Sequence, residues 1–361
     1  MKTYQLKTRQ ICFFFLAFTV VNKLFTLPSL TTSLAKEDLW ISSLINLTLD
    51  FLTIFALLIV CKRQNLSFLE LLEKSFGKMG AKIVIFLYAL YFLLKAYMPI
   101  NEQKSFVELA LYINLTTDIY FLPFFALAFF LALKPLKTIG RISDIVWLFT
   151  VIGLTLLITL SISNTDFYAV LPIGASGVKK IFSASYVGAN WYGEGAYFLF
   201  FIGNFKFGKK DGAKILSCYA VGVFIVTAFM IIFYGVFTSI AFRQSFALTE
   251  IAKYTTVINN IGRFDYVGIL MLLFSNVFAL SIPVFFSAKC LDYVFNFNKK
   301  WIAPLIVTAI LLLTTMYLNE FYATLQKVFS LYLSAFFLVM ANVLPLITLF
   351  FSRKEKKNEK A

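Results

Sequence analysis

The stretch FTVVNKLFTLP, Phe18 to Pro28, lies inside the first apolar segment of the chain and carries Lys23 beside Asn22, five residues before the proline. A charged side chain in the hydrocarbon of a bilayer costs about 2.5 to 3.5 kcal/mol even on the mildest insertion scales. A lysine at that depth is therefore expected to face a charged partner, a cavity or a ligand. The rest of the chain has to supply that environment.

The composition is that of an all-α polytopic membrane protein in a lipid bilayer. Of the 361 residues, 60% are hydrophobic and only 14% are charged, whereas soluble domains contain about 25% charged residues. Apolar runs long enough to cross a bilayer, about 18 to 20 residues, recur from end to end. We therefore expect one transmembrane domain over residues 1–361.

The residue types argue against an enzyme and against binding of nucleic acid. The chain has no histidine, which removes His-based acid–base catalysis, Ser-His triads and His-ligated metals. Its four cysteines are widely spaced and form no metal or disulfide pattern. The net charge of +15 is spread over short connections and the terminal tail, which fits membrane orientation better than a nucleic-acid surface. We expect no catalytic residue, no metal site and no cofactor.

A window of about 20 residues predicts ten transmembrane helices, over 10–30, 39–60, 81–101, 119–136, 142–163, 182–206, 212–241, 265–294, 301–318 and 324–352. An even number puts both termini on one side. The connections on that side carry 22 lysines and arginines, and those on the opposite side, Lys104 among them, carry 8. Because basic residues concentrate in cytoplasmic loops, both termini are predicted to be cytoplasmic.

Ten helices divide into two groups of five, and an odd number in each group makes the second repeat inverted. We expect these inverted repeats over about residues 10–163 and 182–352, with a ligand bound where the first helix of each repeat is broken near the midplane. The sixth span contains YVGANWYGEGAY, Tyr186 to Tyr197, with three glycines and Glu194 at its centre. Glycines permit unwinding, and freed backbone groups persist at that depth only where they line a cavity or bind something. The alternative is that these glycines only let helices pack closely.

These features predict a ligand site between the two breaks. Asp50, central in the second span, is the expected charge partner of Lys23, because pairing offsets the cost of burying both groups. Lys95 is either a further coupling charge, like Asp50 and Glu194, or a side chain that reaches the outer surface between neighbouring tyrosines. The candidate ligand-binding residues are Asn22, Lys23, Thr26, Gly188, Asn190, Trp191, Tyr192, Gly193, Glu194, Gly195, Ser275 and Asn276. For the last two, hydrogen bonding between helices is an equally good interpretation.

Several stretches, taken in order, resemble the B subunits of endospore nutrient germinant receptors, which are spore germination permeases. The first two spans carry Gln10, Leu27–Pro28, Asp38 and Trp40–Ile41–Ser42 at the spacing of that family. Further matching stretches are LLEKSFGKMGAKIVIFLYALYFL, Gly140–Arg141 and the glycine–glutamate core of the sixth span. The resemblance covers nearly the whole chain and depends on order and spacing, with no single decisive motif.

The resemblance implies the fold of the amino acid, polyamine and organocation transporter superfamily, which is LeuT-like, with five plus five inverted helices of which helices 1 and 6 are broken. It also implies a small nutrient such as an amino acid, A-type and C-type receptor subunits as partners, and a place in the cytoplasmic membrane or the spore inner membrane. One departure is that related permeases have glycines before the Leu-Pro pair, where this chain has Val21, Asn22 and Lys23.

Three functions remain open on the sequence. A germinant-receptor subunit would bind its nutrient at the midplane through Lys23 and Glu194, with Asp50 tuning Lys23. A proton- or cation-coupled amino-acid permease would use Glu194 as its titrating group. A noncatalytic scaffold for partner subunits would keep helix 1 unbroken.

Overall fold

The computed structural model describes residues 5–63, 66–110, 117–253, 265–318 and 321–347, and within these ranges every element longer than an isolated bridge is helical. The α-helices are α1 (Thr8–Val21), α2 (Leu27–Ala35), α3 (Leu39–Arg63), α4 (Phe68–Ala110), α5 (Thr117–Leu133), α6 (Leu136–Ser161), α7 (Val178–Val187), α8 (Glu194–Phe201), α9 (Asp211–Phe237), α10 (Ala247–Lys253), α11 (Asp265–Phe295), α12 (Ile302–Tyr317), α13 (Tyr322–Leu331) and α14 (Ser334–Leu338). Shorter turns that matter below are the 3₁₀ helix η4 (Gly188–Trp191) and the π-helix η7 (Val339–Val343).

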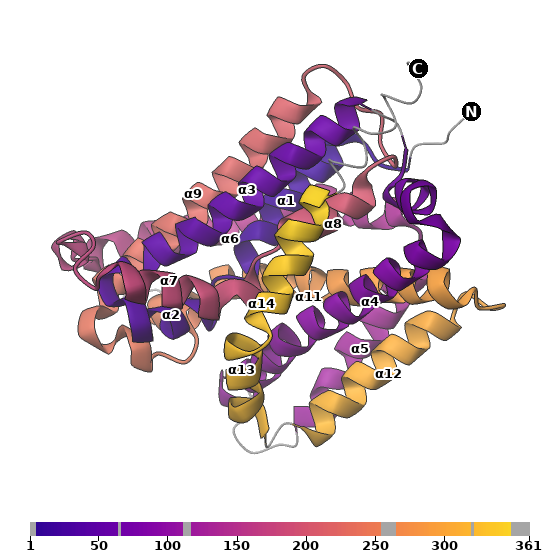
Figure 1. Cartoon of the computed structure of the whole chain (residues 1–361). Helices are drawn as coiled ribbons and strands as arrows, with labels where there is room; N and C mark the ends of the chain where they lie inside the picture. Colours follow the sequence, from indigo (N-terminus) through magenta and orange to yellow (C-terminus); the bar gives the residue numbers. More distant parts are fainter. Residues whose placement is uncertain (1–4, 64–65, 111–116, 254–264, 319–320, 348–361) are drawn as a thin grey trace.

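The long helices form two groups (Figure 1). In one group α1, α3, α6 and α9 pack against one another, and in the other α4, α5 and α12 pack around α11. Helix α11 also packs against α6, which joins the two groups. The short segments α2, α7, α8 and α14 complete the fold, and η7 contacts both α3 and α8.

Helical residues occupy all ten predicted spans as far as the described ranges extend, but three of the spans are interrupted. The first divides into α1 and α2, and the sixth divides into α7 and α8. The tenth is bent by 54° between residues 322–331 and 334–347. Within the described chain, five helices are long and apolar enough to cross a membrane, or six if the bent pair counts as one. The ten-helix inverted repeat therefore stays a prediction.

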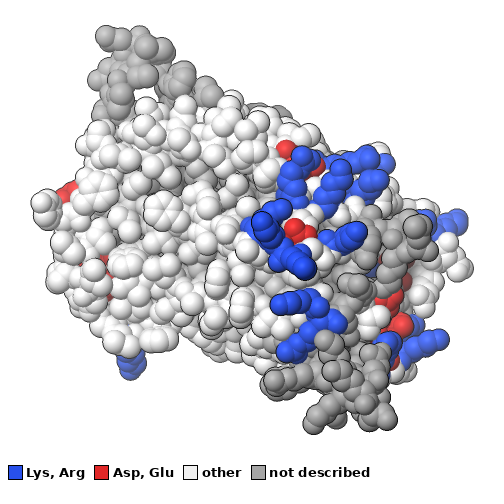
Figure 2. Space-filling view, turned by 90° about the horizontal axis from the view of Figure 1, so that it is seen from above, with Lys and Arg blue, Asp and Glu red and all other residues white. Residues whose placement is uncertain are grey.

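Basic side chains gather at one end of the molecule (Figure 2). The exposed lysines and arginines of this end come from the last turn of α3, the start of α4, the α5–α6 turn, the segment before α9 and the α11–α12 connection, and include Lys62, Lys74, Lys78, Lys134, Lys137, Arg141, Lys209, Lys210, Lys299 and Lys300. Lys104 departs from the predicted loop position, because α4 continues past it and leaves it only 2% exposed. Assignment of the basic end to the cytoplasm stays a prediction.

Asp38 joins the start of α3 to the segment between α6 and α7. Its buried carboxylate accepts hydrogen bonds from the backbone N–H groups of Gly174 at 2.7 Å and Ser176 at 2.9 Å. The Ser176 hydroxyl donates a third bond at 2.5 Å. One carboxylate thus satisfies three polar hydrogens of the segment between α6 and α7 and ties that segment to the start of α3.

We expect Asp38→Ala to lower the free energy of unfolding by about 3 kcal/mol, because hydrogen bonds to a charged group contribute about 1.5 to 3 kcal/mol each and part of this is recovered by water. Thermal unfolding of the protein in detergent micelles measures the loss. Asp166→Ala is the matched control, since the Asp166 carboxylate accepts one exposed bond, from the N–H of Tyr168 at 2.9 Å. Equal losses in the two variants would contradict the role assigned to Asp38.

Candidate functional site

The first break lies between α1 and α2, where residues 22–26 leave the helix. Pro28 has no N–H to donate to Leu24, and it sits instead in the first turn of α2, where a helix tolerates proline. The Lys23 ammonium folds back and donates to the carbonyl oxygen of Thr19 at 2.8 Å. That carbonyl has lost its helical partner, because the Lys23 N–H donates to Val20 instead. The first predicted span is therefore broken at Lys23, so the scaffold interpretation does not gain the support that an unbroken helix would have given it.

Helix α10, from another part of the chain, binds the free backbone carbonyls of the first break. The backbone N–H groups of Ala247 and Leu248 donate to the carbonyls of Phe25 and Leu24 at 2.9 and 3.0 Å. The first N–H groups of a helix have no partner within it, and the carbonyls of the break have none either. Each set satisfies the other, so α10 stabilises the unwound segment without any side chain.

The second break lies between α7 and α8. The chain passes through η4, turns at Gly193 with φ of +114°, and enters α8 at Glu194. A side chain is strained at this φ, and a Cβ added to Gly193 would lie 2.5 Å from the Tyr91 hydroxyl oxygen. The turn therefore requires glycine for two separate reasons. Gly188 begins η4, and Gly195 lies in the first turn of α8.

Two charged side chains from other helices satisfy the backbone of the second break. The Asp50 carboxylate accepts from the N–H groups of Gly193 at 2.7 Å and Glu194 at 3.3 Å. The Lys95 ammonium donates to the carbonyls of Asn190, at 2.8 Å, and Tyr192. Lys95 is only 6% exposed. The prediction that it reaches the outer surface is wrong, because the freed carbonyls give it acceptors inside the protein.

Lys23 and Glu194 connect the two breaks. Their side chains form an ion pair and are 0% and 2% exposed, and the Lys23 ammonium lies 5.0 Å from the ring centre of Tyr192. Direct pairing of Lys23 with Asp50 was the wrong prediction. Asp50 is held instead by N–H groups at the start of α8, where a carboxylate is favoured. With Lys95, these residues form a central cluster of two basic and two acidic side chains.

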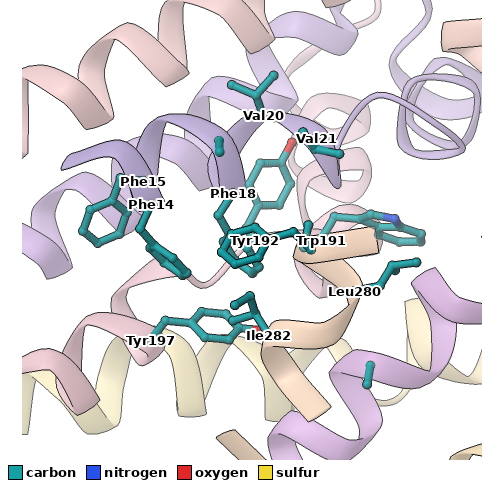
Figure 3. Close-up of a cluster of buried hydrophobic side chains, with 14 of the residues drawn as sticks. Phe14, Phe15, Phe18, Val20, Val21, Trp191, Tyr192, Tyr197, Leu280 and Ile282 are labelled. Atoms are coloured by element: carbon teal, nitrogen blue, oxygen red, sulfur yellow. The ribbon is translucent and has the colours of Figure 1, made fainter. Parts of the chain in front are cut away.

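A cavity of about 10 Å³ lies between the two breaks, and its lining includes Asn22, Lys95, Asn190, Trp191 and Tyr197. Figure 3 shows Trp191 near Leu280 of α11, and Tyr197 near Ile282 of the same helix. Among the described residues, the Asn22 Oδ1, both amide atoms of Asn190 and the Tyr197 hydroxyl are buried without a hydrogen-bond partner. Each such atom costs about 1 to 3 kcal/mol, so the lining is suited to a small polar molecule that would pair with them.

A second polar layer lies on the other side of Trp191. The indole N–H of Trp191 donates to Glu102 Oε2 at 3.5 Å, and the Thr26 hydroxyl lies beside the same carboxylate. Asn276 donates to Gln103, the neighbour of Glu102. Ser275 donates to the Met271 carbonyl of its own helix at 3.2 Å.

The structure therefore divides the predicted site residues into three sets. Asn22, Asn190, Trp191 and Lys95 line the cavity. Lys23, Asp50, Tyr192, Gly193 and Glu194 form or adjoin the charge cluster, and Gly188 and Gly195 flank the second break. Thr26, Ser275 and Asn276 lie outside the cavity lining. Ser275 is hydrogen-bonded within α11, and Asn276 is hydrogen-bonded from α11 to Gln103 of α4.

Sequence reasoning missed two features of the site. The polar run Asn101 to Lys104 is buried, because α4 continues to Ala110 through Pro99. The π-helix η7 also faces the second break, where Thr53 donates to Asn342 at 2.8 Å and the Tyr88 hydroxyl donates to the Met340 carbonyl at 3.2 Å. Such π turns are frequent at functional sites, but no residue pattern predicts this one.

Comparison with known proteins gives a family and a fold. A sequence profile of the family described as spore germination protein matches residues 5–328. No curated protein sequence matches the chain significantly. The structure is similar to MHP1, a nucleobase-cation-symport-1 family transporter in a closed conformation with bromovinylhydantoin bound, with a TM-score of 0.51, 14% identity and coverage of 90% of this chain and 75% of that chain.

It is also similar to two mutant forms of the Eremococcus coleocola manganese transporter, each with a TM-score of 0.53, 12% identity and coverage of 96% of this chain and 75% of that chain. At these identities the likeness concerns the fold. The arrangement of helices in this chain is thus one that is found in membrane transporters.

Proposed function

This chain belongs to the spore germination protein family and is a multi-pass helical membrane protein, and on that premise we propose that it is a receptor subunit for a small polar nutrient, such as an amino acid. The nutrient would bind between the two broken helices, at the cavity beside the central charge cluster. In this proposal the cluster stabilises the unwound backbone of the two breaks, and the unpaired amide and hydroxyl groups of the cavity bind the nutrient.

The observation that carries the proposal is the unpaired polar lining of the cavity. The charges of the cluster already have partners, because Lys23 pairs with Glu194 while Asp50 and Lys95 bind freed backbone groups. The side-chain amide of Asn190 and the side-chain Oδ1 of Asn22 have no hydrogen-bond partner among the described residues. An Asn side chain offers both donors and acceptors, which suits a ligand with polar groups of both kinds.

Binding would require the cavity to widen. Its volume of about 10 Å³ is close to the minimum for one water molecule, so an amino acid enters only if Trp191 and the facing part of α11 move apart. A nutrient that binds only the widened form shifts the equilibrium toward it. We propose that A-type and C-type receptor subunits respond to that shift, and that the complex lies in the spore inner membrane with both termini of this chain in the cytoplasm.

A five-plus-five inverted repeat over residues 10–163 and 182–352 would place the site at the centre of the membrane. Contacts between elements five spans apart support this arrangement. Helix α3 packs against α9, α4 against α11, α5 against α12, and α2 against α7. These are the second, third, fourth and first members of the two proposed repeats, so equivalent members lie side by side, as they do when a pseudo-twofold axis passes between them.

A proton- or cation-coupled amino-acid permease is the second candidate, because the structures that share this fold include a cation symporter and a manganese transporter. Uptake of labelled amino acids by proteoliposomes under a pH or sodium gradient separates the two functions. A receptor that does not transport would show binding without uptake.

Asn190→Leu is expected to abolish the nutrient response without lowering stability. The Asn190 side-chain amide makes no hydrogen bond among the described residues, so an apolar side chain of similar size removes an unsatisfied group rather than an interaction. The measurement is thermal stabilisation of the purified protein by a panel of L-amino acids, together with germination dose–response curves of spores that carry the variant.

Asn46→Leu is the matched control, because the Asn46 amide is equally buried but donates to the Ser185 carbonyl at 2.8 Å. It should lower the free energy of unfolding by about 1 to 3 kcal/mol. A nutrient response that survives in Asn190→Leu would show that the nutrient binds elsewhere.

A further inference from the structure

Glu102 is a buried carboxylate to which the described chain supplies no cation. Its side chain lies on α4, three residues after Pro99 of the cavity lining, and is 4% exposed. Oε2 accepts a long bond of 3.5 Å from Trp191, and Oε1 has no hydrogen-bond partner. The Thr26 hydroxyl lies beside the carboxylate without completing a hydrogen bond. No ion pair of Glu102 occurs in the described ranges.

The other buried charges near the breaks differ from Glu102 in this respect. Lys23 and Glu194 neutralise each other, Asp50 accepts two N–H bonds, and Lys95 donates to two carbonyls. A buried charge is normally paired, because removing it from water is expensive without compensation. Without such a partner a buried carboxyl group holds a proton instead, so a cation that stabilises the ionised form of Glu102 would have to come from outside the described chain.

The position of Glu102 indicates which molecule brings that partner. Thr26 of the first break and Trp191 of the second lie against it, so only the Trp191 indole separates Glu102 from the cavity, and a ligand reaches the carboxylate when that indole moves to widen the cavity. Lys95 lies seven residues earlier on α4, about 10 Å along the helix axis and on the same face. A molecule in the widened cavity would thus have a cation at one end and an anion at the other.

We propose that Glu102 binds the ammonium group of the nutrient, and that the nutrient class is restricted to molecules with a protonated amine, amino acids above all. This inference depends on the proposed function, because it assigns one group of the same ligand. Glu102 would accept the ammonium hydrogens, and the Trp191 ring would lie close enough to add a cation–π contact. Sugars, nucleobases and simple carboxylic acids would lack the group that Glu102 requires.

The test measures binding by the full-length protein in lipid nanodiscs, through thermal stabilisation and titration. The probes are glycine, L-alanine, L-valine and L-asparagine, each paired with the acid that lacks its amino group: acetate, propionate, 3-methylbutanoate and succinamate. The wild-type protein is expected to bind at least one amino acid and none of the paired acids. In Glu102→Gln the affinity for that amino acid should fall about 10- to 100-fold, the range for loss of a charged hydrogen bond.

Two variants complete the design. Glu102→Asp keeps the charge and should retain part of the affinity. Glu37→Gln is the matched control. Glu37 lies on the 3₁₀ helix between α2 and α3, and its partly buried carboxylate accepts a bond of 3.2 Å from the hydroxyl of Tyr234 on α9. The affinity of Glu37→Gln for the amino acid should equal that of the wild type. Without ligand, Glu102→Gln should unfold at the same temperature as the wild type or higher, which excludes misfolding as the cause.

Three outcomes would overturn the inference. Amino-acid binding that is equally tight in Glu102→Gln leaves the proposed function standing and removes the role of Glu102. Stabilisation by sodium chloride but not choline chloride, lost in Glu102→Gln while amino-acid affinity is unchanged, would assign Glu102 to an inorganic cation. A wild-type protein that binds no member of the panel would overturn both this inference and the proposed amino-acid receptor.

Discussion

Lys23→Met is expected to lower the free energy of unfolding by about 3 to 5 kcal/mol, the usual cost of removing one partner of a buried ion pair. The substitution leaves Glu194 buried beside Asp50 with Lys95 as the remaining cation of the cluster. It also removes the donor to the Thr19 carbonyl at the end of α1. For a chain of this size the loss corresponds to a fall in Tm of roughly 4 to 7 °C, which thermal unfolding in detergent micelles detects.

The chain provides its own control for this result. Lys253 and Glu250 form an ion pair at 2.8 Å whose lysine side chain is 54% exposed, and exposed pairs contribute only about 0 to 1 kcal/mol. Lys253→Met should therefore have little effect. If Lys23→Met costs no more than Lys253→Met, the central ion pair does not have the structural role described above.

The double variant Lys23→Met/Glu194→Gln separates stability from function. Removing both charges eliminates the unpaired carboxylate, so the double variant should be more stable than Lys23→Met alone. If the charges also contact the nutrient, as the sequence predicted, the response to amino acids stays lost in the stabilised double variant. A response that returns with stability would limit Lys23 and Glu194 to supporting the breaks.

Gly193→Ala is the second substitution with a large expected effect, a loss of about 3 kcal/mol or more. The φ of +114° costs a residue with a side chain about 1 to 2 kcal/mol. The added Cβ would also lie 2.5 Å from the Tyr91 hydroxyl oxygen and 2.9 Å from Ala341 Cβ, and such overpacking costs about 1 to 3 kcal/mol more. Relief of either strain moves the N–H groups that Asp50 binds.

Two further variants divide this loss into its parts. Gly177 also has a positive φ, +83°, but nothing lies within 4 Å of an added Cβ, so Gly177→Ala should show the cost of a positive φ without any added contact, at a ψ of 149° where Gly193 has 36°. Tyr91→Phe removes the hydroxyl that meets the new methyl group, and should recover part of the stability in the Gly193→Ala background. The Tyr91 hydroxyl has no hydrogen-bond partner in the described structure, so Tyr91→Phe by itself should be nearly neutral. Failure of Tyr91→Phe to recover any stability would contradict the contact as the cause.

The sequence was most informative where the physics is local. Lys23 in an apolar segment and Glu194 between glycines are both costly to bury as charges, which marked them as unusual. Both lie at helix breaks in the structure. Pro28 and the glycines of the sixth span mark where helical hydrogen bonding fails, because proline lacks an N–H and glycine tolerates a turn with positive φ. Hydropathy alone also located the apolar segments that form helices, since each such segment transfers into the bilayer largely by itself, but it did not predict where they end, because α4 continues to Ala110.

The sequence did not predict which groups the buried charged side chains would bind. Asp50 was expected to neutralise Lys23, yet it binds the N–H groups at the start of α8, and Glu194 takes the lysine. Lys95 was expected either to act as a coupling charge or to reach the outer surface, and it binds backbone carbonyls that are free only because the sixth span is broken. Glu102 and Gln103 were placed in a loop, yet α4 carries them into the gap between the breaks.

By itself, then, the sequence determined that this is a helical membrane protein with costly charges at two interrupted segments, because transfer free energies and backbone chemistry depend on a residue and its near neighbours. Only the tertiary structure decided which charge meets which partner. Each break leaves a particular set of N–H and carbonyl groups unsatisfied, and packing decides which distant side chain, or which helix end such as that of α10, lies within 3 Å of them. The FTVVNKLFTLP stretch thus predicted that Lys23 and the broken backbone would require partners, and the fold supplies Glu194 for the lysine and the N-terminus of α10 for the backbone carbonyls.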